Sequence, residues 1–297
     1  MTLITSPSDV IYDTASPLLK RTIADSESIA TKSAAIHTLG TCTFYGGASE
    51  DEILENMTYL LEIVSSDGNS ISAADEPAPV ITALEEWGFL ATLIDDISAE
   101  TEDAMEIFID QLGSSDASVQ IAAGENIALL YEKSYSPPEE NEVLSDSDDD
   151  VITDADDPSP NSKLVKRYDA YRRTDQLVHT LSELSKLSSR SLSKATKKAL
   201  HTNFADILNS VENPTRGPRY QNAISQETGK RYGSRMAVRI HSEGVMRIDK
   251  WWKLMRLKGL RRVLQGGFVV HYERNGVVFE SLPILVMGER ANGKRKD

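Results

Sequence analysis

The chain has 297 residues, of which 40% are hydrophobic and 26% are charged, with a formal net charge of −14. This composition is typical of a soluble globular protein. A single cysteine excludes an intramolecular disulfide and a cysteine-rich zinc site, and it favours the cytosol or nucleus over secretion. No apolar run approaches the roughly 20 residues that span a bilayer. We therefore expect a cytoplasmic or nuclear protein with no signal peptide and no membrane partner.

The first 135 residues contain a repeat that predicts a helical array. Small and apolar residues recur in one register at Ala35–Gly40, Ala83–Gly88 and Ala123–Ala128, and the copies lie 48 and 40 residues apart. These spacings are close to the period of roughly 40–47 residues in HEAT and armadillo repeats. The small residue that ends each copy allows neighbouring helices to approach closely, which explains a glycine inside a helix.

Helices with apolar stripes of their own lie between these copies. Ser49 and Glu52 form a capping box at the start of the stripe that continues from Ile53 to Val64. Trp87 falls on an apolar helical face and is predicted to lie in the core. Cys42 shares a face with Ala35 and is predicted to be a packed thiol, not a nucleophile. The first helix is expected to be short and uncapped, near residues 17–23.

An acidic segment separates two halves of opposite charge. Residues 1–160 contain 34 Asp and Glu and four Lys and Arg, whereas residues 161–297 contain 12 and 28. Residues 136–162 carry ten carboxylates, four prolines and no Lys or Arg, so they are predicted to form a disordered linker. Ser145 and Ser147 are candidate phosphorylation sites, because they lie among the acidic residues that acid-directed kinases favour. The alternative is that this segment is only a solvated tether.

Beyond the linker, the helical pattern resumes with basic charge. Leucines at 177, 181 and 184 and apolar residues from Leu200 to Val211 predict that the array continues over 163–213. A loop is predicted over 214–234, where Pro214, Gly217 and Pro218 end the second helix.

The C-terminal residues predict a small element that mixes strands and a helix. Val238 and Ile240 alternate with Ala237 and Arg239, as in a strand. Residues 247–264 form a helix with apolar residues on two sides, so it is expected to pack on both. Alternation over 268–272 and the dipeptide Asn275-Gly276 predict a type I′ hairpin. The fold class is thus a mainly α armadillo/HEAT-like solenoid, interrupted by the linker, with a β-α-β hairpin domain over 235–290 and a basic tail over 291–297.

The sequence contains no convincing catalytic or metal-binding pattern. Five histidines are scattered without the i, i+4 spacing of a helical metal pair, and no Gly-rich phosphate loop follows a strand. Ser191 to Lys194 matches Ser-x-x-Lys but lacks the companion motifs of acyl-enzymes. We therefore predict a protein that is not an enzyme, with no cofactor, metal or small-molecule substrate.

The basic C-terminal half predicts an RNA-binding surface, because Lys and Arg neutralise phosphates and neighbouring aromatic side chains stack on bases. The alternative is that these cations complement the acidic half within the same molecule. The candidates are Arg167, Arg172, Arg173, Lys197, Lys198, Arg235, Arg239, Lys253, Arg256, Arg261 and Arg262.

Four segments resemble the interferon-related developmental regulator family. They are residues 83–90, residues 120–132, the basic, Phe-containing helix at 197–208, and the segment from Met246-Arg-Ile-Asp-Lys-Trp-Trp to Gln265-Gly-Gly-Phe-Val-Val-His-Tyr. The likeness covers most of the chain outside the linker. It implies an armadillo-like repeat protein without enzymatic activity.

Members of that family are described as transcriptional co-regulators and as factors that occupy translationally inactive ribosomes. Two functions stay open: a repressor of translation that binds ribosomes and ribosomal RNA, or a nuclear scaffold that binds co-regulator proteins in its helical groove. Family members usually carry a basic N-terminal extension and further repeats, so this chain is expected to be a shortened form.

Overall fold

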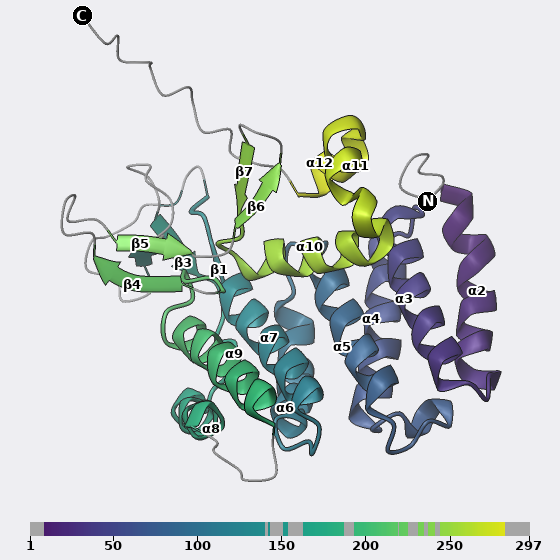
Figure 1. The fold of residues 1–297 in the computed structure, drawn as a ribbon, viewed down its shortest axis with the longest axis horizontal. Coiled ribbons are helices and arrows are strands. Elements are labelled where there is room, and N and C mark those ends of the chain that lie inside the picture. The colour runs from purple at the N-terminus through teal and green to yellow at the C-terminus, as the bar shows by residue number, and fades with distance from the viewer. Residues whose placement is uncertain are drawn as a thin grey trace, which may run out of the picture.

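The computed structural model describes residues 9–139, 142, 151–153, 163–186, 193–218, 220–224, 231–234, 237–240 and 244–282, and most of these are helical (Figure 1). The α-helices are α2 (Asp9–Asp25), α3 (Ile29–Tyr45), α4 (Glu50–Ser65), α5 (Pro77–Ala91), α6 (Ser98–Gln111), α7 (Ala117–Lys133), α8 (Thr174–Lys186), α9 (Lys194–Glu212), α10 (Trp251–Leu264), α11 (Phe268–Arg274) and α12 (Gly276–Ser281). The strands are β1 (Tyr135–Ser136), β2 (Val151–Thr153), β3 (Lys163–Lys166), β4 (Tyr220–Ile224), β5 (Arg231–Ser234), β6 (Ala237–Ile240) and β7 (Gly244–Arg247).

The helices from α2 to α9 pack as four consecutive pairs. The second helix of each pair also contacts the second helix of the next pair: α3 contacts α5, α5 contacts α7 and α7 contacts α9. These four helices form an inner row. The helices α4 and α6 also contact each other and lie outside this row. Each pair buries its apolar side chains against the next pair, as expected of a solenoid with one continuous core. The structure therefore confirms the predicted fold class of helical repeats.

The repeat register fixes how neighbouring inner helices meet. A Cβ atom added to Gly40 in α3 would lie 1.9 Å from Oε2 of Glu86 in α5. One added to Gly88 in α5 would lie 2.2 Å from Oδ1 of Asn126 in α7. Glu86 and Asn126 occupy the same position in successive copies, so each helix places a polar side chain on the glycine of the preceding one. The small residues allow this close approach, as predicted.

The core and the caps agree with the sequence pattern. Trp87 is buried and packs edge-on against Phe108, with ring centroids 4.8 Å apart. The Ser49–Glu52 capping box is present at the start of α4. Cys42 is buried, and this burial raises the pKa of its thiol, which suits a packed side chain. The first helix differs from the prediction: it begins at Asp9 and contains Pro17 within it.

Part of the acidic linker forms a small sheet. The strand order is β1-β3-β2, with both neighbours antiparallel to β3. Val151 pairs with Val165 and Ile152 with Leu164. Disorder was predicted for the linker as a whole, but Val151–Thr153 is its one β-branched run, and it finds apolar partners on β3. Most other linker residues lie outside the described part of the chain.

Helix α10 is covered on two sides, as predicted. It runs crosswise to the inner row (Figure 1) and contacts α5 and α7. Trp251, Met255 and Leu257 are buried, as are Leu254, Leu260 and Leu264. Of its residues, only Arg261 is classed as exposed.

The hairpin predicted after α10 is wrong, because the chain forms α11 and α12 instead. Phe268 and Tyr272 are one helical turn apart, both are buried, and their ring centroids lie 5.8 Å apart. Asn275 is the N-cap of α12, where its side chain accepts a hydrogen bond from the Val277 amide. Asparagine is favoured both in type I′ turns and at N-caps, and the helical burial of Phe268 and Tyr272 decides between them.

Replacing Gly88 by alanine should destabilise the protein by about 1–3 kcal/mol, since the new methyl group would overlap a buried asparagine. Urea unfolding followed by circular dichroism measures this loss. Gly276→Ala is the matched control, because nothing lies within 4 Å of a Cβ at that position. Equal stabilities of the two variants would contradict the close approach of α5 and α7.

Candidate nucleic-acid interface

The N-terminus of α10 is held by a carboxylate from another helix. Glu132, in the last turn of α7, accepts hydrogen bonds from the backbone amides of Trp251 (2.7 Å) and Trp252 (3.0 Å), one to each oxygen. A negative charge is favourable there because the helix dipole is positive at its N-terminus. Burial raises the pKa of Glu132 to about 7, against the opposing effects of Lys250 and the two amides. The indole of Trp251 donates to Ser210 Oγ of α9 at 2.7 Å.

Two cations of α10 meet carboxylates of the inner row. Lys258 pairs with Glu125 of α7. Arg262 pairs with Glu86 and lies 3.3 Å from Glu85, both on α5. The side chain of Glu86 is fully buried, and its Oε1 also lies 2.7 Å from Nδ1 of His37 on α3. His37, Glu85 and Glu125 share one position in the repeat, and of these Glu85 and Glu125 lie beside cations of α10.

Arg256 and Lys253 are also engaged within the molecule. Arg256 donates to Thr92 Oγ1 (2.9 Å), to the Thr92 carbonyl (2.7 Å) and to the Ser281 carbonyl (3.0 Å). Its guanidinium lies 5.4 Å from the ring centroid of Phe44 and 5.2 Å from that of Trp252. Lys253 pairs with Asp249 at 2.5 Å. Arg262 therefore fits the alternative of neutralisation by the acidic half, whereas Lys253 pairs within its own half and Arg256 hydrogen-bonds to neutral oxygens.

Arg167 joins β3 to the start of the linker. Its guanidinium donates to both carboxylate oxygens of Glu142 (3.0 and 3.1 Å), to Ser136 Oγ (2.7 Å) and to the Pro137 carbonyl (2.7 Å). This candidate also has partners within the chain.

Other candidates face solvent. Arg172 lies 3.7 Å from Glu102, and both side chains are more than two-thirds exposed (84% and 75%). Arg173 and Arg239 are exposed, and neither has an ion pair among the described residues. Arg261 is exposed, 5.8 Å above the ring of Phe268. The remaining predicted residues, Arg235, Ser145 and Ser147, lie outside the described part of the chain.

Four lysines gather where α8 meets α9, and we call them the basic corner: Lys186, Lys194, Lys197 and Lys198. His201 Nδ1 lies 2.8 Å from the Ser185 carbonyl, which brings the last turn of α8 beside the second turn of α9. In the described residues these lysines form no ion pair. Lys186 and Lys194 were not among the predicted candidates. The packing of α8 against α9 is a tertiary contact, which periodicity does not give.

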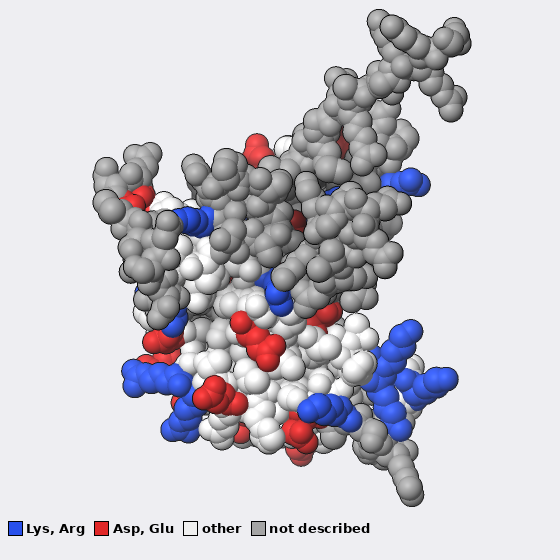
Figure 2. Space-filling model, turned by 90° about the vertical axis from the view of Figure 1, so that its left-hand side faces the viewer, with Lys and Arg blue, Asp and Glu red and all other residues white. Residues whose placement is uncertain are grey.

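Figure 2 shows the face that carries α8 and α9. A group of Lys and Arg side chains gathers at its lower right edge, whereas acidic side chains lie among the cations elsewhere. Among the described residues on this face, the positive charge is therefore concentrated at that edge.

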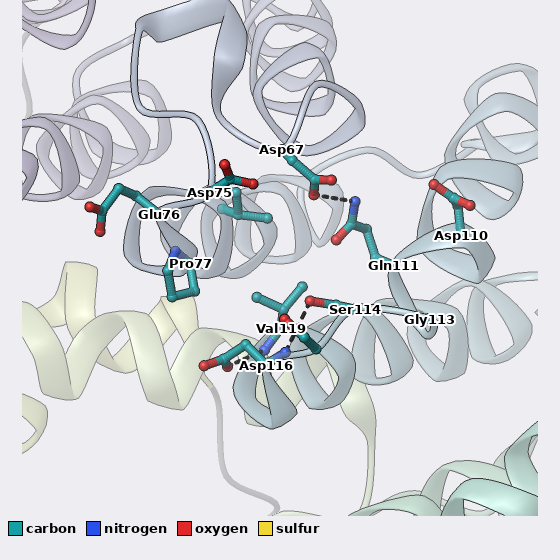
Figure 3. A pocket seen from close by; sticks show the side chains of 12 residues that line it. Asp67, Asp75, Glu76, Pro77, Asp110, Gln111, Gly113, Ser114, Asp116 and Val119 are labelled. Carbon is teal, nitrogen blue, oxygen red and sulfur yellow. Dashed lines mark hydrogen bonds between the residues drawn. The ribbon is translucent and has the colours of Figure 1, made fainter.

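The hollow drawn in Figure 3 has different chemistry. It encloses about 560 Å³ between the loops that follow α4 and α6, and it is lined by five carboxylates. Asp67 accepts a hydrogen bond from Gln111 Nε2 at 2.9 Å, and Asp116 caps α7. These groups stabilise loops and would repel phosphate. The described residues contain no group of His, Cys, Asp or Glu suited to a metal ion, and none of their helices is long and apolar enough to cross a membrane.

The fold defines an α-helical repeat protein whose C-terminal helix packs across the repeats. The model of the interferon-related developmental regulator family matches residues 1–212, so the chain belongs to that family. An uncharacterized protein of Schizosaccharomyces pombe is 29% identical over 227 residues, which cover 76% of this chain and 45% of that protein. Interferon-related developmental regulator 1 of Sus scrofa is 23% identical over 292 residues, which cover 94% of this chain and 55% of that protein.

The chain thus spans about half the length of these two curated relatives. Membership of the family indicates a regulatory role. No positive sign of an enzymatic activity is present among the described residues.

Replacing Glu132 by glutamine should change the pH dependence of stability. Because the pKa of Glu132 is raised, the folded protein binds this proton more tightly than the unfolded chain. Its contribution to stability is therefore largest below about pH 4.5 and falls as the pH rises to about 7. Relative to Glu132→Gln, the wild type should lose roughly 2–3 kcal/mol over this interval. Urea unfolding at several pH values measures the difference, and a flat difference would contradict the assignment.

Replacing Arg262 by glutamine should cost about 3–5 kcal/mol of stability, because it leaves the buried Glu86 carboxylate without its cation. Arg261→Gln removes the same charge from the adjacent, exposed position and should change stability by about 0.5 kcal/mol or less. Thermal and urea unfolding compare the two. Similar losses in both variants would show that Arg262 acts through net charge alone.

Proposed function

We propose that this chain is a regulator without enzymatic activity that binds ribosomes by contacting RNA through its basic corner, and that it represses translation. The observation that carries the proposal is the contrast between two sets of cations. On α10, Lys258 and Arg262 pair with carboxylates of the inner row, and Lys253 and Arg256 have other partners within the molecule. The lysines of the basic corner have no ion pair among the described residues.

The basic corner suits a phosphate backbone. Ser193 caps α9, so the positive end of the helix dipole lies beside Lys194, Lys197 and Lys198. Arg172 and Arg173 lie just before α8, at its other end. The thirteen residues of α8 span about 20 Å, so the two basic groups could follow one strand of RNA over several nucleotides. Binding of this kind releases counterions and weakens steeply with salt.

The alternative function is a nuclear scaffold that binds co-regulator proteins in the helical groove. It has less support from the geometry, because α10 already packs on α5 and α7 of the inner row. A protein partner would need a different surface on these repeats.

The variant Lys197→Glu/Lys198→Glu should weaken binding to ribosomal RNA by about tenfold or more at low salt. The slope of the logarithm of the binding constant against the logarithm of the salt concentration should fall in magnitude by about 2. Filter binding measures both. In sucrose gradients, the wild type should sediment with monosomes at low salt and leave them at high salt, whereas the variant should remain at the top.

Lys20→Glu/Arg21→Glu makes the same change in net charge on α2 and serves as the control. It should bind RNA nearly as well as the wild type. Nuclear retention of the wild type without ribosomal association would favour the scaffold, and equal RNA affinity of the two variants would reject the basic corner.

A further inference from the structure

An open groove of about 540 Å³ lies between the outer helices α4 and α6. Leu61 and Ile107 are half-buried in its floor and pack against the core. Its rims carry four exposed carboxylates, at Glu62 on α4 and at Glu102, Asp103 and Glu106 on α6. We call this feature the acidic groove. It combines an apolar strip with negative charge on both sides.

Most carboxylates of the acidic groove have no cation partner among the described residues. Glu102 has one exposed cation nearby, Arg172 at 3.7 Å. In the part of the chain that the structure describes, Glu62, Asp103 and Glu106 have no ion pair. The inner row behaves differently, since α10 engages Glu85, Glu86, Glu125 and Glu132. The solenoid thus carries two acidic faces, of which one is covered by a helix.

The covered face shows what these repeats can bind. α10 lays Met255 against Gly88 and Gly259 against Phe89 on the inner row, and it directs Lys258 and Arg262 to carboxylates beside them. The acidic groove offers the same two features, an apolar floor and carboxylate rims. Glu102 and Glu106 are one turn apart on the same face of α6, so they match two cations one turn apart on a second helix.

We propose that the acidic groove docks an amphipathic helix, rich in lysine and arginine, of a partner protein. Apolar side chains of that helix cover Leu61 and Ile107, and its cations meet Glu62, Glu102 and Glu106. This is the helix-in-groove mode of recognition, with charges that set specificity. Nucleic acid is excluded from this face, because its phosphates would approach four carboxylates. The proposal does not depend on RNA binding at the basic corner.

A fluorescein-labelled synthetic helix with leucine and lysine at amphipathic spacing serves as the probe, and fluorescence anisotropy measures its affinity for the full chain. Glu102→Lys/Glu106→Lys should raise the Kd about tenfold or more. Asp13→Lys/Glu27→Lys changes the net charge equally at exposed sites outside the groove, and this control should raise the Kd about twofold at most. Circular dichroism establishes that each variant is folded.

Two further measurements separate docking from adsorption of a polycation. Ile107→Gln leaves the charge unchanged and should still weaken binding severalfold, because it removes apolar floor. A probe with glutamate in place of lysine should bind the Glu102→Lys/Glu106→Lys variant better than it binds the wild type. The proposal is overturned if the probe does not bind the wild type, if both charge variants weaken it equally, or if the Ile107 variant binds normally. RNA affinity is measured in parallel and should be unchanged in Ile107→Gln.

Discussion

The contact between α10 and the carboxylates of the inner row is the interaction on which the rest of the molecule depends. It joins residues more than one hundred positions apart, as in the pairing of Lys258 with Glu125. A buried ion pair contributes little more than an apolar pair of equal volume, but a buried charge without its partner costs several kcal/mol. These ion pairs therefore contribute mainly to specificity, because any other position of α10 would leave buried carboxylates without their cations. Glu86 illustrates this, because it is fully buried between Gly40, His37 and Arg262.

Local sequence patterns predicted much of this fold. The apolar residues on both sides of α10 indicated burial on both sides, and the register of Gly40 and Gly88 indicated close helix contacts. The Asn275-Gly276 dipeptide misled because one local signal fits two structures, and tertiary burial of Phe268 and Tyr272 decides between them. The strand Val151–Thr153 was missed because the acids around it dominate the composition of the linker.

The candidate interface was harder to predict than the fold. Periodicity places a cation on a helix face but does not show which carboxylate that face meets, so Arg256 and Arg262 could not be told apart from Lys197 and Lys198. One signal was available in the repeat itself. His37, Glu85 and Glu125 share a register position on helices that carry small residues for close packing. Titratable side chains at one repeat position form a row along the solenoid, and a basic helix with apolar faces is its natural complement.

The arrangement of charge also bears on how the protein would approach a partner. Arg172, next to α8, and Glu102, on α6, lie 3.7 Å apart, so the arginines that precede α8 adjoin the acidic groove. A partner with only phosphate or only basic side chains would be attracted by one surface and repelled by the other. A ribonucleoprotein surface presents both kinds of charge. If the proposed RNA and helix contacts both form, they would reinforce each other through effective concentration. The affinity for such an assembly would then exceed that for RNA or a basic helix alone.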